Sequence, residues 1–186
     1  MIRCWGLILL IIFGALIAAV ISYDINDPSW NNVVAGDATN LLGLIGSHGA
    51  DLLLQSLGLA AYMLAVPFLA WGWRIVSLKG LPYIFMHLLV LPLMVMAASL
   101  TLSTIPIFDS WVLENVGLGG FVGQILLTYV QSFIAFIGID YYPLLVGVFF
   151  GFVTAFCFLY TAGLERSEWK AMTNTVKSAL ASLVIG

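Results

Sequence analysis

The stretch that decides the fold is IRCWGLILLIIFGALIAAVIS, residues Ile2–Ser22. Its one charged residue is Arg3, and nearly all the residues that follow are apolar. A helix needs about 20 apolar residues to cross the hydrocarbon core of a bilayer, and this stretch supplies them. The apolar run is also longer than the roughly 7–15 residues typical of a cleaved signal peptide. We therefore expect a retained membrane-spanning helix over residues 2–22.

The composition extends this expectation to the whole chain. Of its 186 residues, 62% are hydrophobic and 8% are charged, and the mean hydropathy is +1.11. Soluble domains carry roughly 25% charged residues, so this chain has too few polar groups to cover a water-facing surface. Membrane lipid is therefore an expected partner. The net charge of −3 and the lack of a basic run give no indication that the chain contacts nucleic acid.

Further apolar stretches predict an all-α membrane protein with four transmembrane helices. The predicted spans are residues 2–22, 52–75, 81–102 and 142–164. Residues 41–51 and 119–137 are predicted to form two short periplasmic or re-entrant amphipathic helices. These elements make one membrane domain over residues 1–164. Residues 165–186 are predicted to be a cytoplasmic amphipathic tail or the start of a linker.

The charges separate by side of the membrane. The basic residues lie before the first span, between the second and third spans, and after the fourth: Arg3, Arg74, Lys79, Arg166, Lys170 and Lys177. The segments at the other ends of the spans hold acidic residues and no lysine or arginine: Asp24, Asp27, Asp37, Asp51, Asp109, Glu114 and Asp140. Because basic residues stay on the cytoplasmic side, we expect both termini in the cytoplasm. A fifth span at 119–137 would break this pattern.

The two short helices share a glycine pattern. Gly43-Leu-Ile-Gly46 and Gly120-Phe-Val-Gly123 each precede an apolar run that contains a glutamine. Each run leads to a spanning segment that contains a proline. The pattern indicates two similar units, each with a short helix before a span. Chance similarity between glycine-rich apolar sequences is the alternative.

Small residues one helical turn apart predict close helix packing. The pairs are Gly14 with Ala18 and Gly147 with Gly151. Such spacing lets two helix backbones approach closely within lipid. The partner helix lies either in the same chain or in another subunit, and the sequence leaves both open.

The sequence contains no recognisable catalytic or cofactor-binding constellation. No lysine follows a phosphate-binding glycine loop, and His48 and His87 lack cysteine or carboxylate neighbours at metal-ligand spacing. The middle third of each predicted span has no acidic or basic residue, which disfavours an ion-coupled transporter. The alternative kept open is a small transporter or channel subunit. Its path would be lined by His48, Asp51, Gln55 and Gln131.

Several motifs identify a family. The chain carries Asp-Pro-Ser-Trp, Asn-x-x-Gly-x-x-Gly, Ala-Asp and Gly-Gly-x-x-Gly in that order. The residues are Asp27, Pro28, Ser29, Trp30, Asn40, Gly43, Gly46, Ala50, Asp51, Gly119, Gly120 and Gly123. In this order and spacing the chain resembles the N-terminal four-helix membrane domain of the FtsK/SpoIIIE DNA translocases. The resemblance covers nearly the whole chain and is most specific from Asp27 to Arg74.

The resemblance implies a membrane anchor rather than an enzyme. It implies a multi-pass protein of the bacterial inner membrane at the division septum, which associates with other divisome membrane proteins. It also implies a homo-oligomer, a hexamer in the family, that tethers an ATP-driven motor for chromosome segregation. ATP and Mg belong to that motor domain, which has no counterpart in this sequence, so no cofactor is expected here.

The resemblance also supplies candidate interaction residues. They are Asp27, Pro28, Trp30, Asn40, Gly43, Gly46, Asp51, Gly119, Gly120 and Gly123. For Trp30 and Asp27 the hypothesis is contact with a partner or a neighbouring subunit. The alternative for Trp30 is that its ring rests at the lipid headgroup boundary, where tryptophan is enriched.

Overall fold

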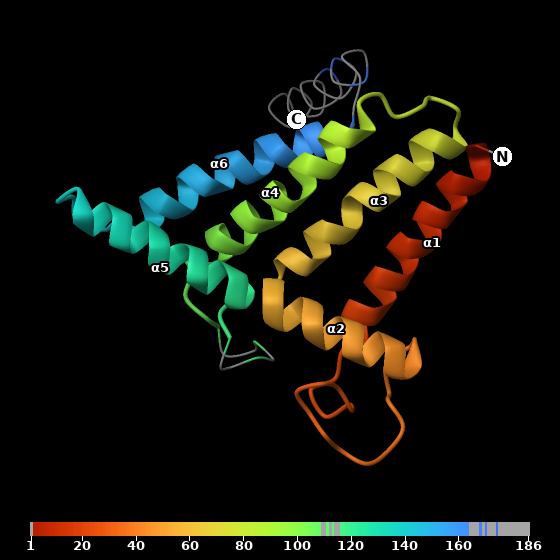
Figure 1. Cartoon of the computed structure of the whole chain (residues 1–186), viewed down its shortest axis with the longest axis horizontal. Coiled ribbons are helices and arrows are strands. Elements are labelled where there is room, and N and C mark those ends of the chain that lie inside the picture. The colour runs from red at the N-terminus through yellow and green to blue at the C-terminus, as the bar shows by residue number, and fades with distance from the viewer. Residues whose placement is uncertain are drawn as a thin grey trace, which may run out of the picture.

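The computed structural model describes residues 2–108, 111, 113, 116–163, 168, 170 and 174. All regular structure among these residues is helical (Figure 1). The helices are α1 (Ile2–Ile21), α2 (Gly43–Leu57), α3 (Ala60–Val76), α4 (Ile84–Ser103), α5 (Gly120–Phe136) and α6 (Pro143–Thr161). The predicted tail at 165–186 falls outside the described residues, apart from Glu168, Lys170 and Asn174.

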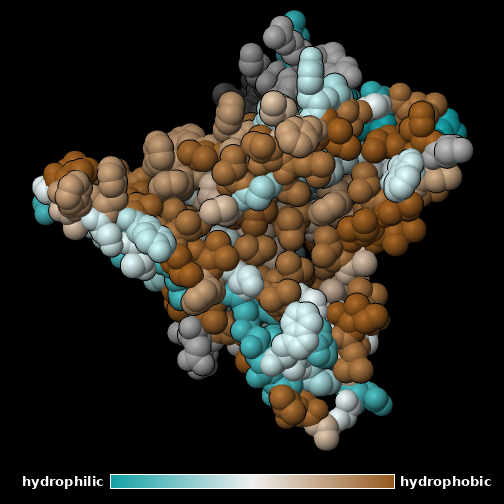
Figure 2. Space-filling model, viewed as in Figure 1, coloured by the Kyte–Doolittle hydropathy of each residue, from teal (hydrophilic) through white to brown (hydrophobic). Residues whose placement is uncertain are grey.

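Helices α1, α4 and α6 are each long and apolar enough to cross a membrane. Helices α2 and α3 qualify together as a fourth span, although the pair is bent by 113°. The predicted all-α membrane fold is therefore confirmed. Figure 2 agrees, since apolar residues cover the long helices and hydrophilic residues gather at the end that carries α2.

The structure divides the predicted span at 52–75 between two helices. The chain bends at Gly58 and Leu59, so α2 continues to Leu57 and α3 begins at Ala60. Gly58 has φ +59°, a left-handed conformation that side chains disfavour. An apolar residue before the bend packs within the protein: Leu54 is buried against Val20 and Leu118. Hydropathy alone does not show the bend.

The long helices form a row rather than a closed bundle. Helix α1 packs against α3, α3 against α4, and α4 against α6 (Figure 1). The two short helices α2 and α5 lie across one end of this row. We call this the acidic end, because loop 22–42 and α2 carry Asp24, Asp27, Asp37 and Asp51 there.

The opposite end, the basic end, holds the start of α1 and the turn between α3 and α4. Arg74 and Lys79 both pair with the carboxylate of Glu168 at 2.5 Å. The indole of Trp71 donates a hydrogen bond to the carbonyl of Thr161 at 2.6 Å, which ties α3 to the end of α6. The charges therefore separate between the ends as expected, which is the arrangement that the positive-inside rule uses to orient a membrane protein.

The order of elements fits the suspected repeat. Helices α1, α2 and α3 and helices α4, α5 and α6 each form a unit of long helix, short helix and spanning helix. Both short helices begin at a glycine with positive φ, Gly43 at +60° and Gly120 at +69°.

Glycines set the closest helix crossings. A Cβ on Gly6 of α1 would lie 2.8 Å from the carbonyl oxygen of Gly72 in α3, and one on Gly72 would lie 2.9 Å from the carbonyl oxygen of Gly6. A Cβ on Gly147 of α6 would overlap the side-chain oxygen of Thr104, the residue that follows α4. Gly14 differs, because nothing in the described chain lies within 4 Å of a Cβ placed there. Among the described residues, no other helix therefore packs closely against α1 at Gly14.

The second residues of the two small-residue pairs, Gly151 and Ala18, also differ in their surroundings. Gly151 lies one turn beyond Gly147, and a Cβ there would be 3.7 Å from the Thr101 side chain, an ordinary contact. Ala18 is half-buried, beside the buried residues Ala19 and Val20 near the end of α1. The α1 glycine that meets a neighbouring helix is Gly6, which the small-residue motif missed.

Candidate functional site at the acidic end

Asp27 organises the loop between α1 and α2. Its carboxylate accepts hydrogen bonds from the Thr39 amide (2.7 Å), the Thr39 hydroxyl (2.9 Å) and the Asn40 amide (2.9 Å). The side chain is buried. Burial by itself raises the pKa of Asp27, but the three hydrogen bonds outweigh it and hold the pKa below its usual value. Asp27 is therefore an ionised carboxylate that joins the two ends of the loop.

Asn40 fastens the loop to the end of α1. Its amide nitrogen donates to the carbonyls of Ala19 (2.8 Å) and Ser22 (3.2 Å), while its amide oxygen accepts from the Leu42 amide (3.1 Å). It thus satisfies carbonyls that the end of a helix leaves unpaired. A Cβ on Gly46 would overlap the Asn40 side chain, so only glycine lets α2 lie this close.

The Asp-Pro-Ser-Trp motif forms a turn over α2. The Pro28 carbonyl accepts a hydrogen bond from the Ser47 hydroxyl, and the Ser29 hydroxyl accepts from the amides of Asn31 (3.2 Å) and Asn32 (3.1 Å). Trp30 instead points outward and is 68% exposed. Its ring packs edge-to-face with the His48 ring, and the two ring centroids are 5.4 Å apart. The turn therefore presents Trp30 on a fixed backbone.

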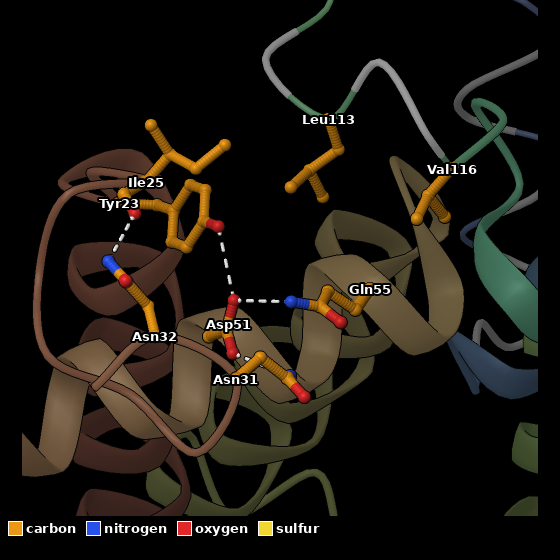
Figure 3. A pocket seen from close by; sticks show the side chains of 8 residues that line it. All are labelled: Tyr23, Ile25, Asn31, Asn32, Asp51, Gln55, Leu113 and Val116. Atoms are coloured by element: carbon orange, nitrogen blue, oxygen red, sulfur yellow. Dashed lines mark hydrogen bonds between the residues drawn. The ribbon is translucent and has the colours of Figure 1, made fainter.

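Asp51 of α2 lies at the centre of a second network (Figure 3). One carboxylate oxygen accepts from the Tyr23 hydroxyl (3.1 Å) and the Gln55 amide (2.8 Å). The other accepts from the Asn31 amide (2.9 Å). Burial, the negative charge of Asp51 and the hydrogen bond to it all raise the pKa of Tyr23, so its phenol stays protonated as the donor.

These side chains line a cavity of about 330 Å³ (Figure 3). Its polar wall is made by the Asp51 network. Its other walls come from two chain segments that are distant in sequence. The complete lining is Tyr23, Ile25, Asn31, Asn32, Asp51, Gln55, Leu113 and Val116.

Glycines join the two units where α2 meets the start of α5. A Cβ on Gly58 would lie 2.6 Å from the Gly120 amide nitrogen, and the Leu59 amide donates to the Leu118 carbonyl at 2.8 Å. Gly119 and Gly123 press in turn against Ser99 of α4. The start of α5 therefore fits directly against the α2–α3 bend and the end of α4.

The structure divides the candidate interaction residues by exposure. Buried members make the loop and the junction: Asp27, Asn40, Gly46, Asp51, Gly119, Gly120 and Gly123. Pro28 and Gly43 are half-buried, and Trp30 is exposed. Trp30 is thus the most exposed of these side chains.

Sequence reasoning missed two members of the Asp51 network, Tyr23 and Asn31. Neither lies in a periodic segment, so no pattern marked them. Gln55 is the member with a local signal, since it lies four residues after Asp51 and therefore on the same helix face.

The residues proposed for a channel path are not gathered into one path. Asp51 and Gln55 are hydrogen-bonded to each other. The His48 ring instead contacts the Leu44 carbonyl and Trp30. Gln131 lies in the outer part of α5, which projects away from α2 (Figure 1). Within the described residues, no three His, Cys, Asp or Glu side chains come together as a group that could hold a metal ion.

Fold and site together define a multi-pass helical membrane domain with a folded loop and an interlocked pair of short helices at one end. The chain belongs to the family described as the 4TM region of DNA translocase FtsK/SpoIIIE, whose model matches residues 3–169. This membership and the apolar helices make it a multi-pass protein of the inner membrane.

Individual relatives support the same family. The DNA translocase FtsK of Azospirillum brasilense is 33% identical over 180 residues, which are 96% of this chain and 27% of that protein. The DNA translocase FtsK of Caulobacter vibrioides is 31% identical over 182 residues, 96% of this chain and 22% of that protein. That of Agrobacterium fabrum is 32% identical over 173 residues, 88% of this chain and 19% of that protein. No solved structure matches the chain.

The match is confined to the membrane region. The chain spans about a quarter or less of the length of these relatives, and no motor domain is evident in it.

Proposed function

We propose that this chain is the membrane anchor and divisome-interaction domain of a DNA translocase that couples cell division to chromosome segregation. The observation that carries the proposal is the family match over residues 3–169 to the membrane region of proteins named DNA translocase FtsK. In this proposal the domain has no motor activity of its own. ATP and Mg act in a motor domain that it tethers.

The proposal includes an oligomer at the division septum. A motor that encircles DNA needs several subunits, and by resemblance the assembly is a hexamer. The exposed face of α1 around Gly14 is available for a neighbouring subunit, because nothing in the described chain occupies it.

The acidic end supports an interaction role through its exposed apolar side chains. Ile25, Trp30 and Val33 are 47%, 68% and 96% exposed, on a loop whose backbone Asp27 and Asn40 hold in place. Apolar side chains displayed on a fixed backbone are typical of protein contact surfaces. Order in the free loop also lowers the entropic cost of binding.

Localisation tests this proposal. The chain fused to a fluorescent protein is expected to collect at midcell in a dividing bacterium. Uniform membrane fluorescence in cells with intact septa would contradict an anchor that reaches the septum.

A pair of tryptophan variants separates loop recognition from simple membrane anchoring. Trp30→Ala removes an exposed aromatic ring at the acidic end, and Trp73→Ala removes one of similar exposure, 62%, near the basic end. If the loop binds a partner, Trp30→Ala reduces the midcell signal and Trp73→Ala does not. Unchanged recruitment of Trp30→Ala would assign its ring to the lipid headgroup boundary instead.

A further inference from the structure

The cavity at the acidic end contains a buried carboxylate, and no cationic side chain of the described residues hydrogen-bonds to it. Asp51 is 3% exposed, and its three hydrogen-bond donors, on Tyr23, Asn31 and Gln55, are all neutral groups. A carboxylate offers about four lone-pair sites, so one site on the oxygen that faces Asn31 is left. Buried charges in proteins are normally paired, because an unpaired charge in a poorly solvated place is unfavourable.

The described residues supply no lysine or arginine at this end. No lysine or arginine occurs between Arg3 and Arg74 or between Lys79 and Arg166. Arg74 and Lys79 lie at the opposite end, where they pair with Glu168. His48, on the same helix as Asp51, directs its ring to the Leu44 carbonyl and to Trp30. Within the described residues, the negative charge of Asp51 therefore has neutral hydrogen-bond donors and no lysine or arginine beside it.

The remaining walls define the shape of a cation that fits the cavity. Apolar residues line the rest of the cavity: Ile25 lies beside the Tyr23 ring, and Leu113 and Val116 come from a separate chain segment (Figure 3). The volume of about 330 Å³ lies at the small end of the range for ligand pockets, about 300–1,000 Å³, so it suits one extended side chain. Lysine and arginine have this form, since apolar methylenes carry a charged head.

We propose that this cavity receives a lysine or arginine side chain from an extracytoplasmic segment of a partner protein. The methylenes lie against Ile25, Leu113 and Val116, and the charged head donates to Asp51. This inference specifies which side chain of a partner the domain binds. It rests on the proposed function only for the assumption that the side chain belongs to a partner protein.

A protein side chain fits better than a lipid ammonium group. The ammonium of a phospholipid is joined to a phosphate, and the same end of the molecule carries Asp24, Asp27 and Asp37. Those carboxylates repel the phosphate. A lysine or arginine side chain brings the cation without an anion.

Peptide binding to the chain in nanodiscs tests the site directly. The bilayer contains phosphatidylcholine and phosphatidylglycerol and no ethanolamine lipid. The probe is acetyl-Ala-Lys-Ala-amide, and its control carries norleucine, which keeps the methylenes and lacks the charge. The readout is the ¹⁵N signals of the Asn31 and Gln55 side-chain amides. We expect saturable shifts with the lysine peptide and none with the norleucine peptide.

Charge-removing variants locate the effect. Asp51→Asn is expected to weaken the lysine peptide by about ten-fold, or about 1.4 kcal/mol. Asp37→Asn removes the same charge from an exposed position in the loop, and affinity should stay within about two-fold. Because Asp51→Asn also disturbs three hydrogen bonds, a second variant leaves Asp51 intact. Ile25→Lys places a tethered ammonium on the cavity wall and should block the peptide, whereas Ile25→Gln removes the same apolar side chain without adding a charge and should weaken binding far less.

The inference is overturned by several results. These are equal binding of the norleucine peptide, no saturable binding of the lysine peptide, or full affinity in both Asp51→Asn and Ile25→Lys. Shifts that arise only when phosphatidylethanolamine enters the bilayer would assign the cavity to lipid and overturn the protein partner. The proposed function is judged separately by midcell recruitment, so peptide binding can fail while recruitment succeeds, and the reverse.

Discussion

Replacing Asp27 by alanine should open the loop between α1 and α2 without unfolding the helices. The carboxylate accepts three hydrogen bonds, two from Thr39 and one from Asn40. The Thr39 groups are exposed, so water replaces most of what they lose. The Asn40 amide is buried and loses a charged acceptor, which costs about 1.5–3 kcal/mol. The total for the loop is therefore about 2–3 kcal/mol.

Amide hydrogen exchange of the chain in nanodiscs measures this effect. The reporter is the Gly43 amide, which donates to the Asn40 carbonyl at 2.8 Å and has no bond to Asp27 itself. A loss of 2–3 kcal/mol lowers its protection about 30- to 150-fold, since about 1.4 kcal/mol is a factor of ten. The control is Asp37→Ala, a change to an exposed side chain of the same loop that should alter protection by less than about two-fold.

Acid should produce the same opening through Asp27. Its pKa is lowered in the folded state, so the unfolded loop binds a proton more readily. The stabilisation is therefore complete above the unfolded pKa of about 3.9 and is lost as pH falls through the lower folded pKa. Gly43 protection in the native chain should hold from about pH 7 to 5 and fall below about pH 4. In Asp27→Ala this pH dependence should disappear.

Two outcomes would refute this reasoning. One is protection of Gly43 within about two-fold of the native chain after Asp27→Ala, which would mean that the loop is held by other contacts. The other is an equal loss in Asp37→Ala, which would assign the effect to net charge and not to the hydrogen bonds of Asp27.

The remaining predictions concern two glycine contacts and are checked by denaturant unfolding in detergent micelles. Gly58→Ala puts a Cβ 2.6 Å from the Gly120 amide nitrogen at a residue with φ +59°, so strain and overpacking together should cost more than about 3 kcal/mol. Gly43→Ala, with φ +60° and open space, should lose only about 1–2 kcal/mol, and equal losses would exclude a tight junction. Gly72→Ala should cost about 1–3 kcal/mol because it separates α3 from α1, whereas Gly14→Ala should be neutral or slightly stabilising. Similar losses at positions 72 and 14 would contradict the crossing.

Local sequence properties were enough to predict the membrane class. Hydropathy over about 20 residues is a property of a continuous segment, so α1, α4 and α6 could be predicted within a few residues of their ends. The same reasoning did not show the bend within 52–75, where Leu54 packs against the end of α1 and the segment before α5. The bend depends on Gly58 meeting Leu118 and Gly120, which are about 60 residues away in sequence, and no local pattern reports such a contact.

The candidate site divides in the same way. The resemblance to a family was enough to select Asp27, Asn40, Gly46 and Asp51. It did not predict the contacts that each of them makes. That Asn40 reaches back to Ala19 was decided only by the fold.

The sequence by itself therefore determined that the chain lies in a membrane, where its spans approximately lie, and how its charges separate. Each of these properties depends on composition along one segment. The tertiary structure alone decided the 113° bend, the interlocked glycines and the cavity around Asp51. Each of these requires backbones or side chains from distant segments to meet within a few ångströms. Tyr23, Asn31 and Gln55 converge on one carboxylate only after α1, the loop and α2 have packed together.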